Sequence, residues 1–415
     1  MRAGTLRSMT AVAASVQPRT RSLTISGAEK AQRVQRVRDE LDARGLDGLV
    51  LFHPQRIGYL TNFVFVSTER PMALVVPARG NLGILIPRLE QEHVARAPEI
   101  EDITIYPEYP GERHPMHYLH ELLHRAGLLG RKLAADTDGY GDVMGYLGPS
   151  LGEINHDGTL SVARDIVDRM RQVKSPAELD LVRESCTWGN LAHRLLQKHM
   201  AIGKTEIEIS LQASTEAILI MLDTLGASYA SPGRGVRNPP VSASFIAGAN
   251  TALPHGMRRE QGLELGDAII TGAGANVGGY QSELERTMIV GEPKREFVEY
   301  FDAMLAIQEA GFRAVRPGRT CADVDADVRD EIQRAGLSHL TRHHTGHGMG
   351  LEGHESPFLD LGDQTEIQPG MVFSIEPGLY VPGVAGFRHS DTAIVTEDGI
   401  ELATYYPRDL AALIV

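Results

Sequence analysis

The sequence has few of the features that mark disulfide-linked, membrane-spanning or nucleic-acid-binding proteins. Its only cysteines are Cys186 and Cys321, and neither lies in a CxxC pair or beside clustered histidines. This argues against a disulfide framework and a structural zinc motif, and it predicts a cytoplasmic protein. No apolar run approaches the roughly 20 residues that span a bilayer, so we expect no integral membrane protein.

Positive charge is also in short supply. Lys and Arg number 41 against 54 Asp and Glu, which gives a net charge of −13. Nucleic-acid binding depends on clustered Lys and Arg, so this balance argues against a nucleic-acid partner and favours a small-molecule substrate. What is present is typical of a globular chain, with 42% hydrophobic residues, and a length of 415 residues suggests two domains.

Residues 1–28 differ from the rest of the chain because no acid precedes Glu29 while several arginines and hydroxyl residues occur. This composition superficially resembles a transit peptide. It has neither a long apolar core nor a cleavage box, so we interpret it as a flexible N-terminal extension.

Residues 29–155 predict a small α/β domain. Ser26 and Glu29 form an S-x-x-E capping box, and Gly45 ends the helix that follows. Apolar runs then predict strands, and periodic segments predict helices, in the order strand 48–52, strand 73–76, strand 82–86, helix 118–126 and strand 132–135.

Residues 156–415 predict an α+β domain with an internal repeat. A long helix begins after Ser175, and a glycine turn followed by a threonine N-cap occurs at Gly203–Thr205 and again at Gly318–Thr320. We therefore predict two related halves with a ligand site where they meet. Short strands are expected at 244–247, 268–271, 287–290, 371–375 and 393–395.

Two carboxylates in this domain are spaced for chemistry. Glu283 and Glu285 are two residues apart, so on a strand both point to the same face. They repel each other unless a proton or a cation lies between them, and the candidates are a metal, a cationic substrate or Arg286. A salt-bridged rim without catalytic function is the alternative.

Four further titratable residues lie in glycine-flanked segments, where a ligand can approach the backbone: His255, His347, His354 and Glu376. A lone histidine is more often a hydrogen-bonded structural residue than a catalytic one. The shared setting favours a common site. We interpret His339, His343 and His344 as loop or surface residues.

Together these segments resemble the pita-bread family of peptidase family M24, which includes Xaa-Pro aminopeptidases, prolidase and creatinase. The resemblance covers the chain from residue 29 onward and rests on the segments Leu253–Gly256, Gly279–Thr287, Thr345–Gly350, Gly353–Glu355 and Phe373–Gly378. It implies a creatinase/prolidase-like α/β N-terminal domain and an α+β pita-bread catalytic domain with an internal pseudo-twofold repeat.

The metal ligands that the resemblance implies are incomplete. Five side chains hold two metals in the family's peptidases, and these positions fall on Gly272, Glu283, His347, Glu376 and Ser390. Gly and Ser supply no anionic oxygen, so we expect the two-metal site to be lost.

Creatinase, which works without metal, is the member that the chain resembles more. Its A-L-E-R-T and R-P-x-A-L-V-V segments are similar to Glu283–Thr287 and Arg70–Val76. The resemblance implies a homodimer in which the N-terminal domain of one subunit completes the other's site. The implied catalytic residues are His255, Glu285, Glu376 and His347, and the implied substrate-binding residues are Arg70, His354, Glu283 and Arg388.

We therefore predict a metal-independent hydrolase that needs no cofactor and cleaves a guanidino, amidine or amide C–N bond of a small carboxylate-bearing substrate. His255 would act as general base. One alternative is a metal-dependent Xaa-Pro aminopeptidase or dipeptidase that uses one ion of Mn, Fe, Co or Zn. The ligands would be drawn from Glu283, Glu285, His347, Glu376 and Asp391. Another is a catalytically inactive binding module, which the retained acid–base residues argue against.

Overall fold

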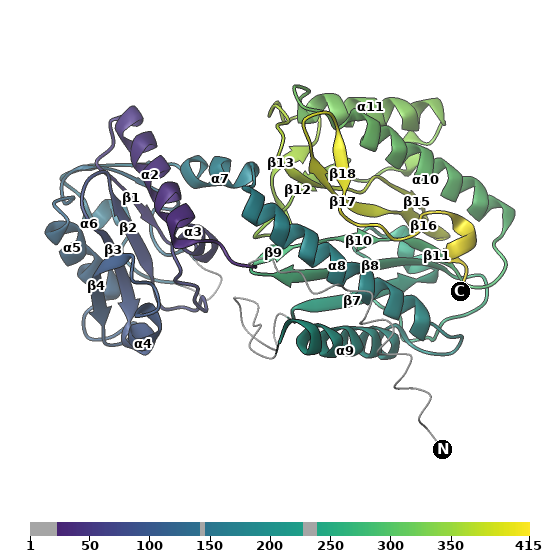
Figure 1. Cartoon of the computed structure of the whole chain (residues 1–415), viewed down its shortest axis with the longest axis horizontal. Helices are drawn as coiled ribbons and strands as arrows, with labels where there is room; N and C mark the ends of the chain where they lie inside the picture. The colour runs from purple at the N-terminus through teal and green to yellow at the C-terminus, as the bar shows by residue number, and fades with distance from the viewer. Residues whose placement is uncertain (1–22, 142–145, 227–238) are drawn as a thin grey trace, which may run out of the picture. The chain divides into compact units, whose positions relative to one another are not determined.

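The computed structural model describes residues 23–141, 146–226 and 239–415, which form two compact units, 25–171 and 172–415 (Figure 1). The division falls later than the boundary at 155 expected from the sequence. The reason is β6 (Thr159–Val162), which pairs in parallel with β5 (Lys132–Ala135) and so extends the sheet of the first unit. Most of the N-terminal extension predicted for 1–28 lies outside the described residues.

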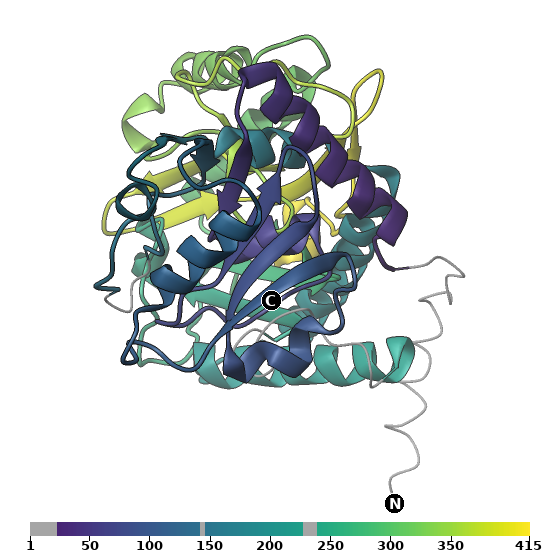
Figure 2. The same cartoon turned by 90° about the vertical axis from the view of Figure 1, so that its left-hand side faces the viewer.

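The first unit is built on a six-stranded sheet in the order β4-β3-β2-β1-β5-β6. Helix α2 packs against β1 and β2, and Figure 2 shows this purple helix beside the blue strands. The remaining strands are β1 (Gly48–Leu51), β2 (Ala73–Pro77), β3 (Leu82–Pro87) and β4 (Ile100–Tyr106). The helices are α2 (Gly27–Arg44), α3 (Pro54–Leu60), α4 (Gln91–Val94), α5 (Pro115–Arg125), α6 (Leu151–Ile154) and α7 (Asp165–Gln172).

Apolar runs account for the strands that the sequence predicted in this unit. Every residue of β1, β2 and β3 is buried, as continuous apolar runs require. The N-terminal helix begins at Ser26, whose side chain accepts a hydrogen bond from the Glu29 amide, and ends at Gly45 with φ 65°. The predicted α/β class is confirmed.

The second unit combines a ten-stranded sheet with four long helices and a two-stranded sheet of β15 and β16. The main path of the large sheet runs β11-β8-β10-β17-β14-β12-β13, with β7 and β9 paired to β8 and β18 paired to β17. Helix α8 packs against β7, β8 and α9, and α10 packs against α11 (Figure 1). Here the long helices are α8 (Pro176–His199), α9 (Glu206–Leu225), α10 (Arg295–Ala314) and α11 (Cys321–Arg334).

The strands of this unit are β7 (Val241–Ala247), β8 (Ala268–Val277), β9 (Tyr280–Gln281), β10 (Leu284–Glu285), β11 (Thr287–Ile289), β12 (Gly346–Gly348), β13 (Glu355–Leu359), β14 (Val372–Ile375), β15 (Gly378–Val381), β16 (Ala385–Arg388), β17 (Ser390–Val395) and β18 (Ile400–Leu402).

The internal repeat is visible in the two helix pairs. Gly203 between α8 and α9 has φ 83°, and Gly318 between α10 and α11 has φ 82°, a left-handed conformation that favours glycine. Each turn is followed by a threonine capping box, at Thr205 and at Thr320. The predicted α+β domain with two related halves is confirmed.

One remaining property of the helices concerns membranes. Within 23–141, 146–226 and 239–415, no helix combines the length and the apolar character that a membrane crossing requires.

Candidate metal centre

One face of the large sheet gathers the titratable residues, because neighbouring strands place them side by side. Directly opposed residues of antiparallel strands share a face, as do residues two apart on one strand. His347 on β12 is opposite Ser374 on β14, and Glu376 follows two residues later. Glu285 on β10 is opposite Ser390 on β17. The sheet order therefore brings both glutamates and the histidine to one place.

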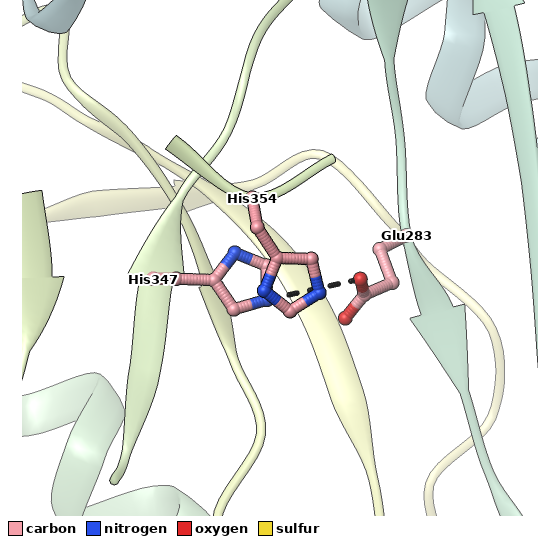
Figure 3. A group of neighbouring side chains, drawn as sticks. All are labelled: Glu283, His347 and His354. Atoms are coloured by element: carbon pink, nitrogen blue, oxygen red, sulfur yellow. Dashed lines mark ion pairs between the residues drawn. The ribbon is translucent and has the colours of Figure 1, made fainter. Parts of the chain in front are cut away.

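Figure 3 shows the side chains of Glu283, His347 and His354 pointing toward one another. The His347 side chain has no exposed surface, and its Nε2 atom lies 3.9 Å from Glu283 Oε2. Its ring stacks on that of His354 with 3.7 Å between the ring centroids. Ligand atoms of these three residues lie within 4.8 Å of one another.

The His347 ring presents Nε2 to the carboxylates of Glu283 and Glu376. Nδ1 lies 3.1 Å from the Gly348 carbonyl oxygen, an acceptor, so Nδ1 carries the proton. Nε2 is buried, and no hydrogen bond from the described residues satisfies it, although Glu376 Oε1 is 3.3 Å away. A buried unpaired nitrogen aimed at two carboxylates calls for a cation.

The charges around this nitrogen reinforce one another. Burial would lower the pKa of His347, but the carboxylates of Glu376 and Glu283 outweigh it and raise that pKa. Burial would likewise raise the pKa of Glu376, but His347 and Arg388 lower it to about 2. The carboxylate groups thus favour positive charge at this point of the site.

The residues present fit a divalent metal ion. Besides the first cluster, ligand atoms of Glu283, Glu285 and Glu376 lie within 4.8 Å of one another. Imidazole nitrogen and carboxylate oxygen are donors suited to Zn, Mn, Fe and Co. The Nδ1 atom of His347 lies 3.1 Å from the Gly348 carbonyl oxygen, and metal-bound histidines commonly donate from their second ring nitrogen to such a carbonyl.

Glu285 is paired with an arginine from a distant part of the chain. Arg388, at the end of β16, donates from Nη2 to Oε1 at 2.8 Å and from Nε to Oε2 at 2.5 Å. Arg388 Nη1 also donates to the Tyr380 hydroxyl at 3.0 Å. Burial, helped by Glu283 and Glu376, raises the pKa of Glu285 to about 7, while Arg388 acts to lower it.

The two ligand positions that carry no carboxylate have specific surroundings. A Cβ atom at Gly272 would lie 3.7 Å from Glu285 Oε1, an ordinary contact distance, so the Glu285 carboxylate lies directly beside this glycine. Ser390 and Ser374 both donate to Glu283 Oε1, at 2.6 and 2.5 Å. The carboxylate of Glu285 therefore lies beside position 272, and position 390 contributes a hydroxyl.

The other predicted residues have different positions. His255 is exposed and lines an open pocket together with Glu285, Arg388 and Gly272. Asp391 points to the opposite face of β17, where Arg286 Nη2 donates to it at 2.8 Å, and we leave it out of the ligand set.

Arg70 lies in the first unit, where its Nε donates to Glu108 Oε1 at 2.6 Å. The hydrogen bond to Glu108 raises its pKa. Its role in substrate binding stays a prediction.

Two residues of the site were missed from the sequence. The Tyr380 hydroxyl lies 2.7 Å from His343 Nε2, and it accepts from Arg388. His343 was interpreted as a surface residue, yet it is half-buried, and burial lowers its pKa. The sequence did contain a signal for Tyr380, which lies just after the Glu376-Pro377-Gly378 segment. Its strand pairs with the strand that carries Arg388.

Comparison with known proteins identifies both units. Residues 180–397 match the model of metallopeptidase family M24, and residues 33–173 match that of the creatinase/prolidase N-terminal domain. The chain is 31% identical over 389 residues to a Mycobacterium tuberculosis protein named "Probable dipeptidase PepE", covering 88% of this chain and 92% of the relative.

Solved structures agree with this match. The dipeptidase PepE structure from Mycobacterium ulcerans superposes with a TM-score of 0.78 at 27% identity, covering 94% of this chain and 100% of that chain. The Xaa-Pro dipeptidase from Bacillus anthracis gives a TM-score of 0.76 at 26% identity, covering 93% and 100%.

These names overturn two predictions made from the sequence. The prediction of a metal-independent, creatinase-like hydrolase is wrong, because the relatives are named dipeptidases within a metallopeptidase family. The expectation of no cofactor is wrong for the same reason. Counting ligands by position alone caused the error, because His354, which is outside the five positions counted, lies with Glu283 and His347 in one group of possible ligands.

Proposed function

The chain belongs to metallopeptidase family M24, and on that premise we propose that it is a metal-dependent dipeptidase that hydrolyses the peptide bond of short peptides. The observation that carries the proposal is the buried Nε2 of His347, which has no hydrogen bond from the described residues and faces Glu283 and Glu376. Relatives named dipeptidase and Xaa-Pro dipeptidase support the choice of substrate class.

In this proposal Glu283, His347 and Glu376 hold the ion, with His354 beside them. A bound divalent ion polarises the scissile carbonyl and lowers the pKa of water. His255, exposed at the edge of the pocket, would take the proton of the attacking water and give it to the leaving nitrogen.

Arg388 and Tyr380 keep Glu285 in place during this chemistry. The guanidinium satisfies both oxygens of Glu285, and the Tyr380 hydroxyl accepts from the same guanidinium. An ion pair held by two hydrogen bonds keeps the Glu285 carboxyl in one orientation beside the reacting atoms.

The test is a hydrolysis assay on a panel of dipeptides with and without proline in the second position. Protein dialysed against a chelator should lose activity, and Mn²⁺, Co²⁺, Fe²⁺ or Zn²⁺ should restore it. Full activity of the chelated protein toward its best dipeptide, or no hydrolysis of any dipeptide by the reconstituted protein, would contradict the proposal.

We also propose that the chain acts in the cytoplasm as a homodimer in which Arg70 binds the substrate carboxylate. Both cysteines are free and buried, which supports a reducing compartment. Light scattering should give twice the chain mass of 45.3 kDa. Arg70→Ala should raise KM, and Arg70→Lys should restore only part of the affinity because it lacks the planar fork. A monomer, or an unchanged KM for Arg70→Ala, contradicts this assignment.

A further inference from the structure

The carboxylates of the site fall into two sides with different cations. The histidine side consists of Glu283, His347 and His354, and the arginine side consists of Glu285 and Arg388. Glu376 lies between them, with Oε1 3.3 Å from His347 Nε2 and Oε2 3.8 Å from Arg388 Nε.

We propose that the chain binds one divalent ion, on the histidine side, and that the guanidinium of Arg388 replaces a second ion on the arginine side. This inference rests on the proposed metal-dependent function and specifies how many ions that function uses.

The arginine side already holds a permanent cation. Both oxygens of Glu285 accept from Arg388, and the two side chains are only 13% and 12% exposed. Guanidinium stays protonated at any pH that the fold tolerates, and it cannot leave, because it is covalently part of the chain. A divalent ion added here would repel this charge and compete with it for the same oxygens.

The strand pairing explains why this side has its own carboxylate. β10 pairs antiparallel with β8, with Leu284 opposite Ala273, which places Glu285 beside Gly272. A Cβ at position 272 would lie 3.7 Å from Glu285 Oε1, in ordinary van der Waals contact, so the Glu285 carboxylate lies directly beside this glycine. The negative charge beside Gly272 on β8 thus comes from Glu285 on β10, and Arg388 neutralises it.

Glu283 has one oxygen left for metal. Oε1 accepts from the hydroxyls of Ser374 and Ser390, whereas Oε2 faces His347 Nε2. A carboxylate that bridges two ions uses one oxygen for each. With Oε1 capped by hydroxyls, Glu283 serves a single ion.

The histidine side has the features of a metal site that the arginine side does not have. His347 Nε2 is fully buried, has no hydrogen bond from the described part of the chain, and faces the carboxylates of Glu283 and Glu376. Glu283, His354 and Glu376 surround it with further donors. One ion satisfies the buried nitrogen and neutralises the carboxylates together.

Metal content of the purified, unmutated protein tests the inference first. After apoprotein is loaded with excess Mn²⁺ and dialysed, elemental analysis should give one ion per chain, and calorimetric titration of apoprotein should show one binding site. Electron paramagnetic resonance of the Mn²⁺ protein should show isolated ions without exchange coupling. Two ions per chain, or coupled spins, would overturn the single-ion inference while leaving the proposed dipeptidase intact.

Two neighbouring glutamates provide a matched pair of variants. Glu283→Gln should weaken Mn²⁺ binding by about 10²-fold or more, since even outer partners of metal ligands change affinity by about 10- to 100-fold. Glu285→Gln should keep one ion per chain, because Glu285 serves Arg388. Glu401→Gln is the control, because it removes a carboxylate on β18 that pairs with Arg183 of α8. It should bind Mn²⁺ as tightly as the unmutated protein does.

The outcomes separate the inference from the function on which it depends. If Glu285→Gln loses the ion as completely as Glu283→Gln does, the metal depends on both sides of the site. That result would overturn the inference. No bound ion in the unmutated protein, combined with dipeptide hydrolysis that resists chelation, would overturn the proposed function as well. Circular dichroism of each variant excludes unfolding as the cause.

Discussion

On one side of the site Glu283 faces the imidazoles of His347 and His354, and on the other side Glu285, two residues away, faces the guanidinium of Arg388. Both carboxylates point to one face of the sheet and require positive charge. The imidazole side leaves a buried nitrogen open to an exchangeable ion, whereas the guanidinium side is satisfied within the chain. The difference teaches that losing a ligand at one position need not remove a metal site, because only one half of the centre depends on that position.

The opposite face of the sheet carries another acidic residue, Asp391, whose counter-charge is Arg286 of the same chain. Asp391, next to Ser390 on β17, accepts from Arg286, Gln308 and Thr404, and its side chain is 1% exposed. All its polar partners come from the chain. This pair is structural, and it provides a reference for the arginine side of the site.

The largest expected effect comes from removing the open nitrogen. His347→Ala should lose its bound ion and reduce kcat/KM for dipeptides by more than about 10³-fold, since a Lewis-acid contribution of several kcal/mol is lost. Metal analysis and steady-state kinetics measure both. His339→Ala, which removes an exposed histidine eight residues earlier, is the control. If His347→Ala keeps its bound ion, the ion does not depend on the histidine side, and the difference between the two sides is wrong.

A second prediction concerns the buried pair on the far face. Asp391→Asn should reduce the free energy of unfolding by about 3–5 kcal/mol, because Arg286 would remain buried without its counter-charge. Metal content should not change, since Asp391 does not reach the site. Urea unfolding and elemental analysis check this, with the exposed Asp398→Asn as control. Loss of metal at unchanged stability would return Asp391 to the ligand set.

Much of the fold could be predicted from the sequence, because apolar runs and capping boxes are local signals. Strands β1, β2, β3 and β5 coincide with predicted runs, whereas β4 and β6 were missed because they are partly or largely exposed. The shared face of Glu283 and Glu285 was also predictable, since side-chain alternation is local.

The partners of these carboxylates could not be predicted, because strand order is not local. Arg286 was one candidate cation for the glutamates, but it donates to Asp391 on the other face, and Arg388 from a separate sheet pairs with Glu285. Replacement of a missing carboxylate at Gly272 by Glu285 is likewise visible only once β8 and β10 lie side by side.

The smallest expected effect tests how Glu283 is divided between its hydroxyl partners and the ion. Ser390→Ala removes a hydroxyl that donates to Glu283 Oε1 and lies 2.6 Å from the hydroxyl of Ser374, the second donor to that oxygen. Unfolding free energy should fall by about 0.5–1.5 kcal/mol, the net value of one hydrogen bond, and metal affinity should weaken by about tenfold at most. Thr396→Ala, which removes a hydroxyl just past β17 that donates to Asp398, should leave metal affinity unchanged. A second ion bound by Ser390→Ala would mean that the hydroxyl had been excluding metal from Oε1. If Glu283 has one oxygen open to the ion, Ser390→Ala should bind the same number of ions slightly more weakly. The Ser390 hydroxyl supports Glu283 without touching the ion.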